Sequence, residues 1–156
     1  MFGCSDKKSE EPPIDIQFAE LSPEDSARLE TQRALVAAAI RKRYGPHTLT
    51  KTKADLAIIQ RLVDDKVFAN TQTDELQALG VVFGDVLANE LGLRWVMVTD
   101  AYGTDPVLRY KETSIQLGAL TMISKRVEEG REVELEQLLK AISQHVKNMI
   151  QSGEYK

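Results

Sequence analysis

Residues 93–119, LRWVMVTDAYGTDPVLRYKETSIQLGA, decide the fold class of this chain. Residues 93–98 are rich in β-branched and aromatic side chains, which is typical of a strand, and the turn-rich run 100–106 follows them. We predict that residues 107–111 form the returning strand of a hairpin. Apolar side chains then alternate with polar or small ones over residues 115–119, which predicts a third strand. The segment therefore indicates a three-stranded antiparallel β-meander.

Helical patterns lie on both sides of this meander. Ser22-Pro23, followed by two acidic residues, predicts the start of a helix, and residues 14–21 before it read as extended chain. Apolar spacing predicts helices over about 23–44, 52–66, 73–91, 121–129 and 134–150. Gly80 and Gly84 lie on one face of the third helix, where a neighbouring element could approach closely.

The predicted fold class is α+β, with N-terminal helices, the meander and a C-terminal helix around one core. The meander, residues 93–120, is expected to pack on helices 73–91 and 134–150. Trp95 should then be largely buried. The chain has 156 residues, 42% of them hydrophobic, so residues 14–156 are expected to form a single domain.

Composition excludes several classes of partner. The formal net charge is -4 and 28% of the residues are charged, without the basic excess that nucleic-acid binding usually requires. No apolar run is long enough for a transmembrane segment. The two histidines, His47 and His145, are about one hundred residues apart and show no metal-binding spacing, and no glycine-rich phosphate loop is present. We therefore expect no metal, no cofactor and no nucleic acid.

The N-terminal segment differs from the rest of the chain. Residues 5–13, SDKKSEEPP, are charged and proline-containing with no apolar side chain, so residues 1–13 read as a disordered polar tether. Before them, Gly3-Cys4 resembles the end of a bacterial lipobox. A signal sequence upstream of Met1 would make this a periplasmic lipoprotein anchored by lipid at Cys4, whereas the chain as written would be cytoplasmic. Both interpretations remain open.

The candidate binding residues surround the predicted hairpin: Asp100, Tyr102, Asp105 and Arg109. A turn needs the glycine at 103 and tolerates aspartate, but it does not require an aromatic side chain and an arginine as well. Arg109 should lie on the strand face opposite Leu108. The simpler interpretation, which we prefer, is an ion pair from Arg109 to Asp100 or Asp105 that holds the hairpin together.

A family resemblance appears at the same residues. Leu93-Arg94-Trp95-Val96, the hairpin residues that follow, and Thr121-Met122-Ile123-Ser124-Lys125-Arg126 resemble the bacterial family known as domain of unknown function 3806. The resemblance spans about 76–139. It implies a bacterial source and an uncharacterised domain, with no active site to transfer.

Two classes of function remain. The first is a non-enzymatic binding or interaction module with an unknown protein or small-molecule partner. The second is a hydrolase-like enzyme that uses carboxylates such as Asp100 and Asp105, because acid–base pairs need no fixed sequence motif. A deep pocket enclosing two carboxylates would favour the enzyme, and an exposed hairpin rim would favour the binding module.

Overall fold

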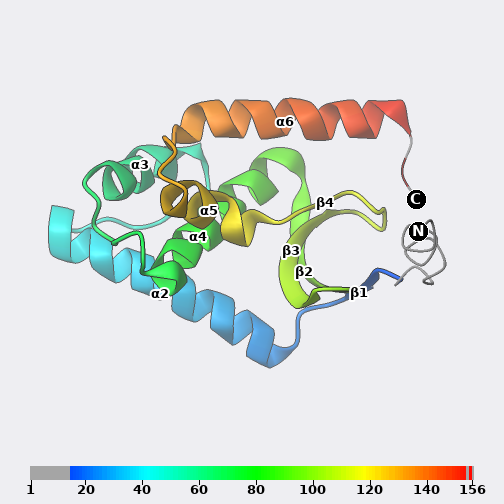
Figure 1. Ribbon diagram of the computed structural model, residues 1–156, viewed down its shortest axis with the longest axis horizontal. Helices are drawn as coiled ribbons and strands as arrows, with labels where there is room; N and C mark the ends of the chain where they lie inside the picture. Colours follow the sequence, from blue (N-terminus) through cyan, green and yellow to red (C-terminus); the bar gives the residue numbers. More distant parts are fainter. Residues whose placement is uncertain (1–14, 154, 156) are drawn as a thin grey trace, which may run out of the picture.

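The computed structural model describes residues 15–153 and 155. The predicted tether and Cys4 lie outside these residues, so the lipid anchor stays a prediction. Figure 1 shows the order of elements: β1 Gln17–Ala19, α2 Pro23–Tyr44, the 3₁₀ turn η1 Lys53–Asp55, α3 Leu56–Asp64, α4 Thr73–Leu91, β2 Leu93–Asp100, β3 Gly103–Tyr110, β4 Gln116–Leu117, the 3₁₀ turn η2 Ala119–Thr121, α5 Met122–Glu128 and α6 Leu135–Ser152.

The helix boundaries follow local chemistry. At the start of α2, the Ser22 hydroxyl accepts from the Asp25 backbone N–H at 3.0 Å, and the Asp25 carboxylate accepts from the Ser22 N–H at 2.9 Å. This reciprocal cap satisfies two backbone donors that have no partner within the helix. Gly92 ends α4 in the left-handed conformation at φ 67°, which glycine adopts without strain.

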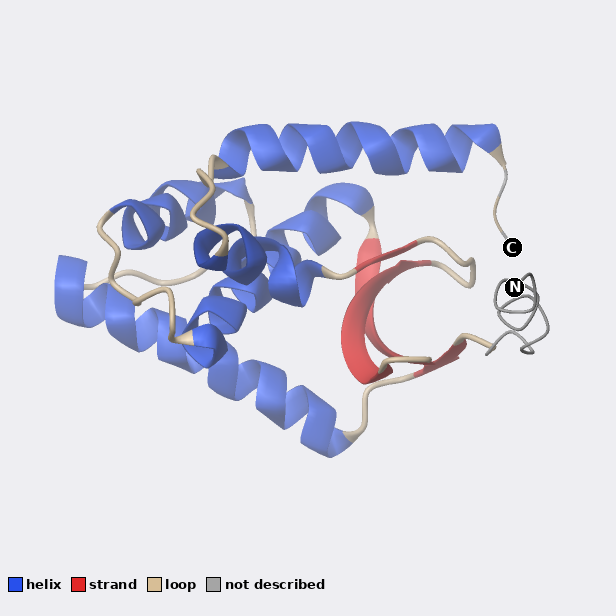
Figure 2. Ribbon diagram, viewed as in Figure 1, coloured by secondary structure: helices blue, strands red, loops and turns tan. Residues whose placement is uncertain are grey.

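Helix α4 is the centre of the fold. Every residue from Leu76 to Leu87 except Gln77 is buried. A helix that is apolar on all sides must be covered on all sides. In Figures 1 and 2, α2 and α5 lie against α4, and α6 runs along the outer side of the helical layer. Among the described residues, no helix is long and apolar enough to cross a membrane.

The sheet is antiparallel with the strand order β1-β2-β3-β4. The expected hairpin is confirmed, and β2 pairs with β3 from Leu93↔Tyr110 to Asp100↔Gly103. Figure 2 shows the strands bending into a C whose outer side faces the helices. The outer face packs into the main core through Leu93, Leu108 and Leu117, while Val96, Val98 and Val107 form a second apolar cluster on the inner face.

The α+β class is confirmed, but the three-stranded meander is a partial description. A fourth strand, β1, pairs with Met97–Thr99 of β2, and the third predicted strand shortens to two residues because Ala119 already belongs to the turn η2. Phe18 supplies the one large apolar side chain of β1, so this strand had no alternating pattern to reveal it. Helix α6 packs on α3 and α4. Trp95 is partly buried against the main core.

Candidate functional site

The structure separates the predicted site residues along the hairpin. Asp100 lies opposite Gly103 at the turn, whereas Arg109 lies opposite Arg94 near the other end of the pair. At about 3.3 Å per residue, roughly 20 Å of strand lies between Gly103 and Arg109. Arg109 and Tyr102 therefore belong to different surfaces.

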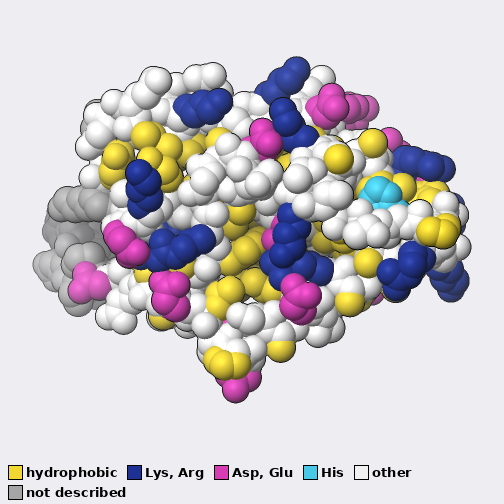
Figure 3. Space-filling view, turned by 180° about the vertical axis from the view of Figure 1, so that it is seen from behind, with side chains coloured by type: hydrophobic (Ala, Val, Ile, Leu, Met, Phe, Trp, Pro, Cys, Tyr) yellow, Lys and Arg dark blue, Asp and Glu magenta, His cyan; other side chains and the backbone are white. Residues whose placement is uncertain are grey.

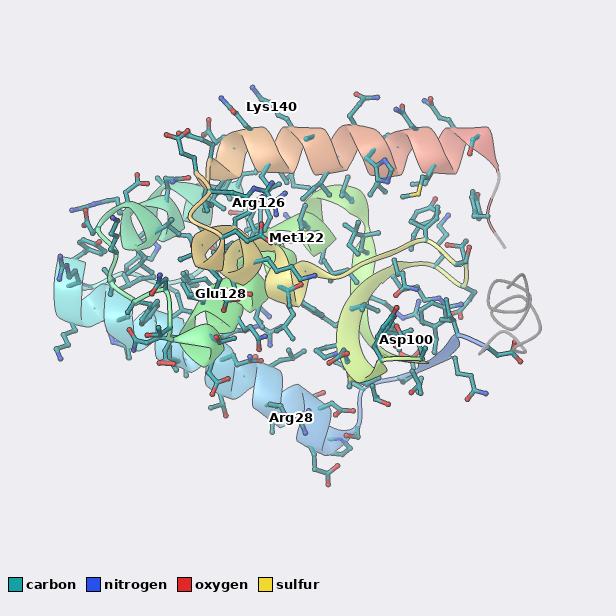
Figure 4. All side chains as sticks on the ribbon, in the orientation of Figure 1. Arg28, Asp100, Met122, Arg126, Glu128 and Lys140 are labelled. Atoms are coloured by element: carbon teal, nitrogen blue, oxygen red, sulfur yellow. The ribbon has the colours of Figure 1, made fainter. Side chains whose placement is uncertain are left out.

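Tyr102 and Asp100 lie together at the turn of the hairpin. The Tyr102 side chain is 94% exposed. The Asp100 carboxylate accepts a hydrogen bond from the Tyr102 backbone N–H at 2.8 Å. This contact of the turn uses the backbone of Tyr102 and not its ring. Figure 4 marks Asp100 at the end of the curved strands, near β1.

Strand β1 brings a further apolar side chain to the same place. Gln17 pairs with Thr99, so continuing the register by one residue puts Ile16 beside Asp100. Ile16 is 55% exposed. Asp105, opposite Val98, and Asp15 are also exposed. We call this group the acidic tip: Asp15, Ile16, Asp100, Tyr102 and Asp105.

Arg109 points away from the main core, as predicted from strand alternation, but it covers the inner face of the sheet. Its guanidinium carbon lies 3.8 Å from the centre of the Phe18 ring, and its Nε donates to the Thr113 carbonyl at 2.7 Å. Only 14% of the side chain is exposed. The arginine therefore shields the second apolar cluster and presents little of its donor fork to a partner.

The expected ion pair of Arg109 with Asp100 or Asp105 is wrong in its partners. Among the described residues, Arg109 pairs with Glu112, with Nη1 and Oε2 3.4 Å apart. The register explains the difference, because Asp100 and Asp105 lie towards the turn and Glu112 follows the end of β3. This pair lies within one segment, at the end of β3, and does not join β3 to β2.

Arg94 joins three segments beside Arg109. Its Nη2 contacts the carboxylates of Glu20 at 2.8 Å and Glu112 at 3.0 Å, and its Nη1 donates to the Lys111 carbonyl at 3.1 Å. The hydrogen bond and positive charge of Arg94 lower the pKa of the Glu20 carboxyl.

We expect this lowered pKa to be measurable. The carboxylate is the form that binds Arg94, so the pair is intact above the ordinary glutamate pKa and is lost as the pH falls through the lowered one. Carbon-13 NMR titration should show Glu20 titrating below the ordinary glutamate pKa, and Arg94→Gln should return it to that ordinary value. Identical Glu20 titrations in both proteins would mean that the pair does not form in solution.

Sequence reasoning missed a buried charge network between α2 and α4. The Asp85 carboxylate is 6% exposed and forms a two-pronged contact with Arg33, Nε to Oδ2 at 2.7 Å and Nη2 to Oδ1 at 2.9 Å. Trp95 Nε1 also donates to Asp85 Oδ1 at 3.0 Å. The hydrogen bonds that Arg33 donates to the Asp85 carboxylate raise the pKa of Arg33. An aspartate within the apolar pattern of α4 was the available signal.

Asp85 lines a cavity of about 280 Å³ together with a second buried carboxylate, Asp55. Asp55 accepts from the backbone N–H groups of Thr50 and Lys51 and from the Thr50 hydroxyl, at 2.8 to 3.0 Å. Both carboxylates are thus held by fixed donors.

A larger groove of about 610 Å³ lies between the segment after α3 and the loop before α6. Its apolar part includes Leu62, Leu76, Leu79 and Val133, all buried members of the main core. Charges of both signs line the remainder. The face of the molecule in Figure 3 likewise mixes Lys and Arg with Asp and Glu and shows no extended patch of one sign.

Comparisons with known proteins agree with the fold. The model of a domain of unknown function, DUF3806, matches residues 55–138. No curated protein matches this chain. A crystal structure of a protein from Bacteroides thetaiotaomicron VPI-5482 is similar at 18% identity with a TM-score of 0.76, over 87% of this chain and 50% of that one.

The chain therefore spans half the length of that solved protein, and at this identity the likeness shows the fold alone. The match to the family model establishes more than the likeness to the solved structure does. It runs from the end of η1 to the first turn of α6, so it includes the hairpin, Asp85 and the two segments that line the larger groove. Because the matched residues make up more than half of its length, the chain belongs to the family of domain of unknown function 3806.

Proposed function

We propose that this chain is a non-enzymatic binding domain and that its acidic tip contacts the partner. The observation that carries the proposal is the position of two side chains. Tyr102 and Ile16 are the large hydrophobic side chains that the described residues leave exposed, and both lie at the same end of the sheet. Single exposed apolar residues are common, whereas apolar side chains grouped at one end of a sheet are typical of interaction surfaces.

The fold makes little use of the side chains at the tip. The turn is completed by the Asp100 carboxylate and by Gly103, whose φ of 128° favours glycine. The Tyr102 ring stabilises neither of these features. Tyrosine is enriched among residues that dominate binding energy, because its ring offers apolar area and a polar hydroxyl at small entropic cost.

The surroundings of the carboxylates support a binding domain over a hydrolase. Asp100 and Asp105 do not line either of the cavities described above. The carboxylates that do share a cavity, Asp55 and Asp85, are occupied by fixed donors. An enzyme that used the tip would have to activate water on an open surface, where the electrostatic advantage of an enclosed site is lost.

We expect Tyr102→Ala to leave the free energy of unfolding within about 0.5 kcal/mol of the parent, because the ring is exposed. Binding to the natural partner should weaken by roughly 30-fold or more if this ring is an interface anchor. A photoreactive phenylalanine at position 102, irradiated in cells that express the full chain, should form a specific crosslinked product.

The matched control places the same photoreactive residue at Lys140, which projects from the outer side of α6 in Figure 4. Equal crosslinking at positions 102 and 140 would show that the acidic tip is not the contact surface. A crosslinked product that is specific to position 102 and disappears in a competing excess of parent protein would support it.

A further inference from the structure

We infer that the partner of the acidic tip is a cationic, extended protein segment that adds to the free edge of β1. This inference rests on the proposed function, since it concerns the same surface. Three features of the molecule support it: the open edge of β1, the carboxylates near its turn end, and the exposed Tyr102 ring at the same end of the sheet.

The open edge belongs to Gln17–Ala19. Strand β1 is the first in the sheet order and pairs with β2 on one side, so no described strand lies on its other side. Backbone groups at such an edge are available to a further strand. Addition of an extended segment is a common mode of peptide recognition, because main-chain hydrogen bonds supply affinity while alternate side chains supply specificity.

Carboxylates surround the turn end of this edge, and the cations nearest to β1 are Arg109, which covers the Phe18 ring, and Arg94, which pairs with Glu20. Residues 15–19 and 99–106 contain no lysine or arginine, and their aspartates lie on successive strands, with Asp15 just before β1, Asp100 at the end of β2 and Asp105 on β3. Asp100 accepts one bond from the Tyr102 N–H. Asp15 and Asp105 form no ion pair or side-chain hydrogen bond within the described part of the chain. The nearest arginines along the hairpin, Arg94 and Arg109, already contact Glu20 and Glu112.

This charge selects among the possible occupants. A second copy of the chain would bring a second set of aspartates to the same edge, and like charges across adjacent strands are destabilising. Nucleic acid and anionic lipid surfaces would be repelled for the same reason. A cationic segment is attracted by this surface. Its lysines or arginines can pair with carboxylates at this end of the sheet, and one of them can lie over the Tyr102 ring.

The apolar side chains of β1 determine which side chains the added segment should carry. Ile16 and Phe18 are two residues apart, so both side chains point to the inner face of the sheet. This is the face that carries the second apolar cluster. An added strand would place every second side chain beside them. The segment that fits is therefore one in which basic and apolar residues alternate.

The inference can be tested with a capped heptapeptide of alternating valine and lysine and the full chain labelled with nitrogen-15. We expect saturable NMR shifts at residues 15–20 and 99–105. Asp15→Asn combined with Asp105→Asn should weaken binding at least tenfold. Glu132→Gln, which removes an exposed and unpaired carboxylate from the loop before α6, should leave the affinity unchanged.

Two further peptides decide the chemistry. A peptide with glutamate in place of lysine should bind at least tenfold more weakly, and so should a lysine peptide whose alternate backbone nitrogens are methylated to prevent strand pairing. Equal binding of the glutamate peptide would overturn the cationic partner, and equal binding of the methylated peptide would overturn strand addition. Shifts confined to other residues would overturn both.

The crosslinking experiment separates this inference from the proposed function. A specific crosslink at position 102 together with no preference for the lysine peptide would leave the binding surface in place and reject the cationic segment. Absence of both would reject the surface as well. A lysine-selective peptide shift that is lost in Tyr102→Ala would support the two together.

Discussion

Replacing Asp85 with alanine is expected to reduce the free energy of unfolding by about 3–5 kcal/mol, the usual cost of removing one partner of a buried ion pair. The loss is large because Arg33 stays in place with 16% of its side chain exposed, loses the carboxylate that accepted two of its hydrogen bonds, and keeps only the exposed Glu30 as an ion-pair partner. The Trp95 N–H loses its acceptor too. Urea denaturation of parent and variant measures the difference.

Two controls show whether the buried pair is the cause. Asp105→Ala removes an exposed aspartate and should change the stability by less than about 0.5 kcal/mol. Combining Asp85→Leu with Arg33→Met replaces both charges by apolar groups and should recover much of the loss, because buried ion pairs are often no more stabilising than well-packed hydrophobic residues. A loss below about 1 kcal/mol for Asp85→Ala would contradict this expectation and show that the ion pair with Glu30 is enough to hold Arg33.

Much of the fold could be predicted because its signals are local. The Ser22-Pro23 start and the Gly45 stop defined α2 to the residue, and the change of apolar period at Gly92 separated α4 from β2. Strand β1 could not be assigned to the sheet in this way. Its partner residues are about 80 positions away, and a three-residue strand with one large apolar side chain carries too little pattern to specify pairing.

The site was less accessible to sequence reasoning, for a geometric reason. Tyr102 and Arg109 are close in sequence, but Tyr102 lies at the turn of the hairpin and Arg109 lies near the opposite end of the strand pair. The two side chains therefore have different neighbours. The position of Arg109 over Phe18 depends on a contact between distant segments. The exposure of Tyr102 was consistent with turn chemistry, whereas its neighbour Ile16 became visible only once β1 was placed beside β2.

Gly80→Ala is the second substitution with a large expected effect. A Cβ at position 80 would lie 2.3 Å from the Leu120 carbonyl oxygen and 2.8 Å from that of Ala119. Both are backbone atoms of the turn η2, which cannot move aside as a flexible side chain could. Alanine favours a helix over glycine by about 1 kcal/mol, but overpacking a core usually costs about 1–3 kcal/mol and sometimes more.

We therefore expect Gly80→Ala to lower the free energy of unfolding by about 2 kcal/mol or more, because α4 and η2 must move apart. Gly118→Ala is the matched control. It makes the same substitution one residue before η2, at a φ of -84° and with no atom within 4 Å of the new Cβ, so it should be neutral or slightly stabilising. Thermal and urea unfolding of the two variants provide the comparison. If Gly80→Ala proved as stable as Gly118→Ala, the close approach of α4 to η2 would not exist in solution, and the glycine pair at 80 and 84 would lose its packing explanation.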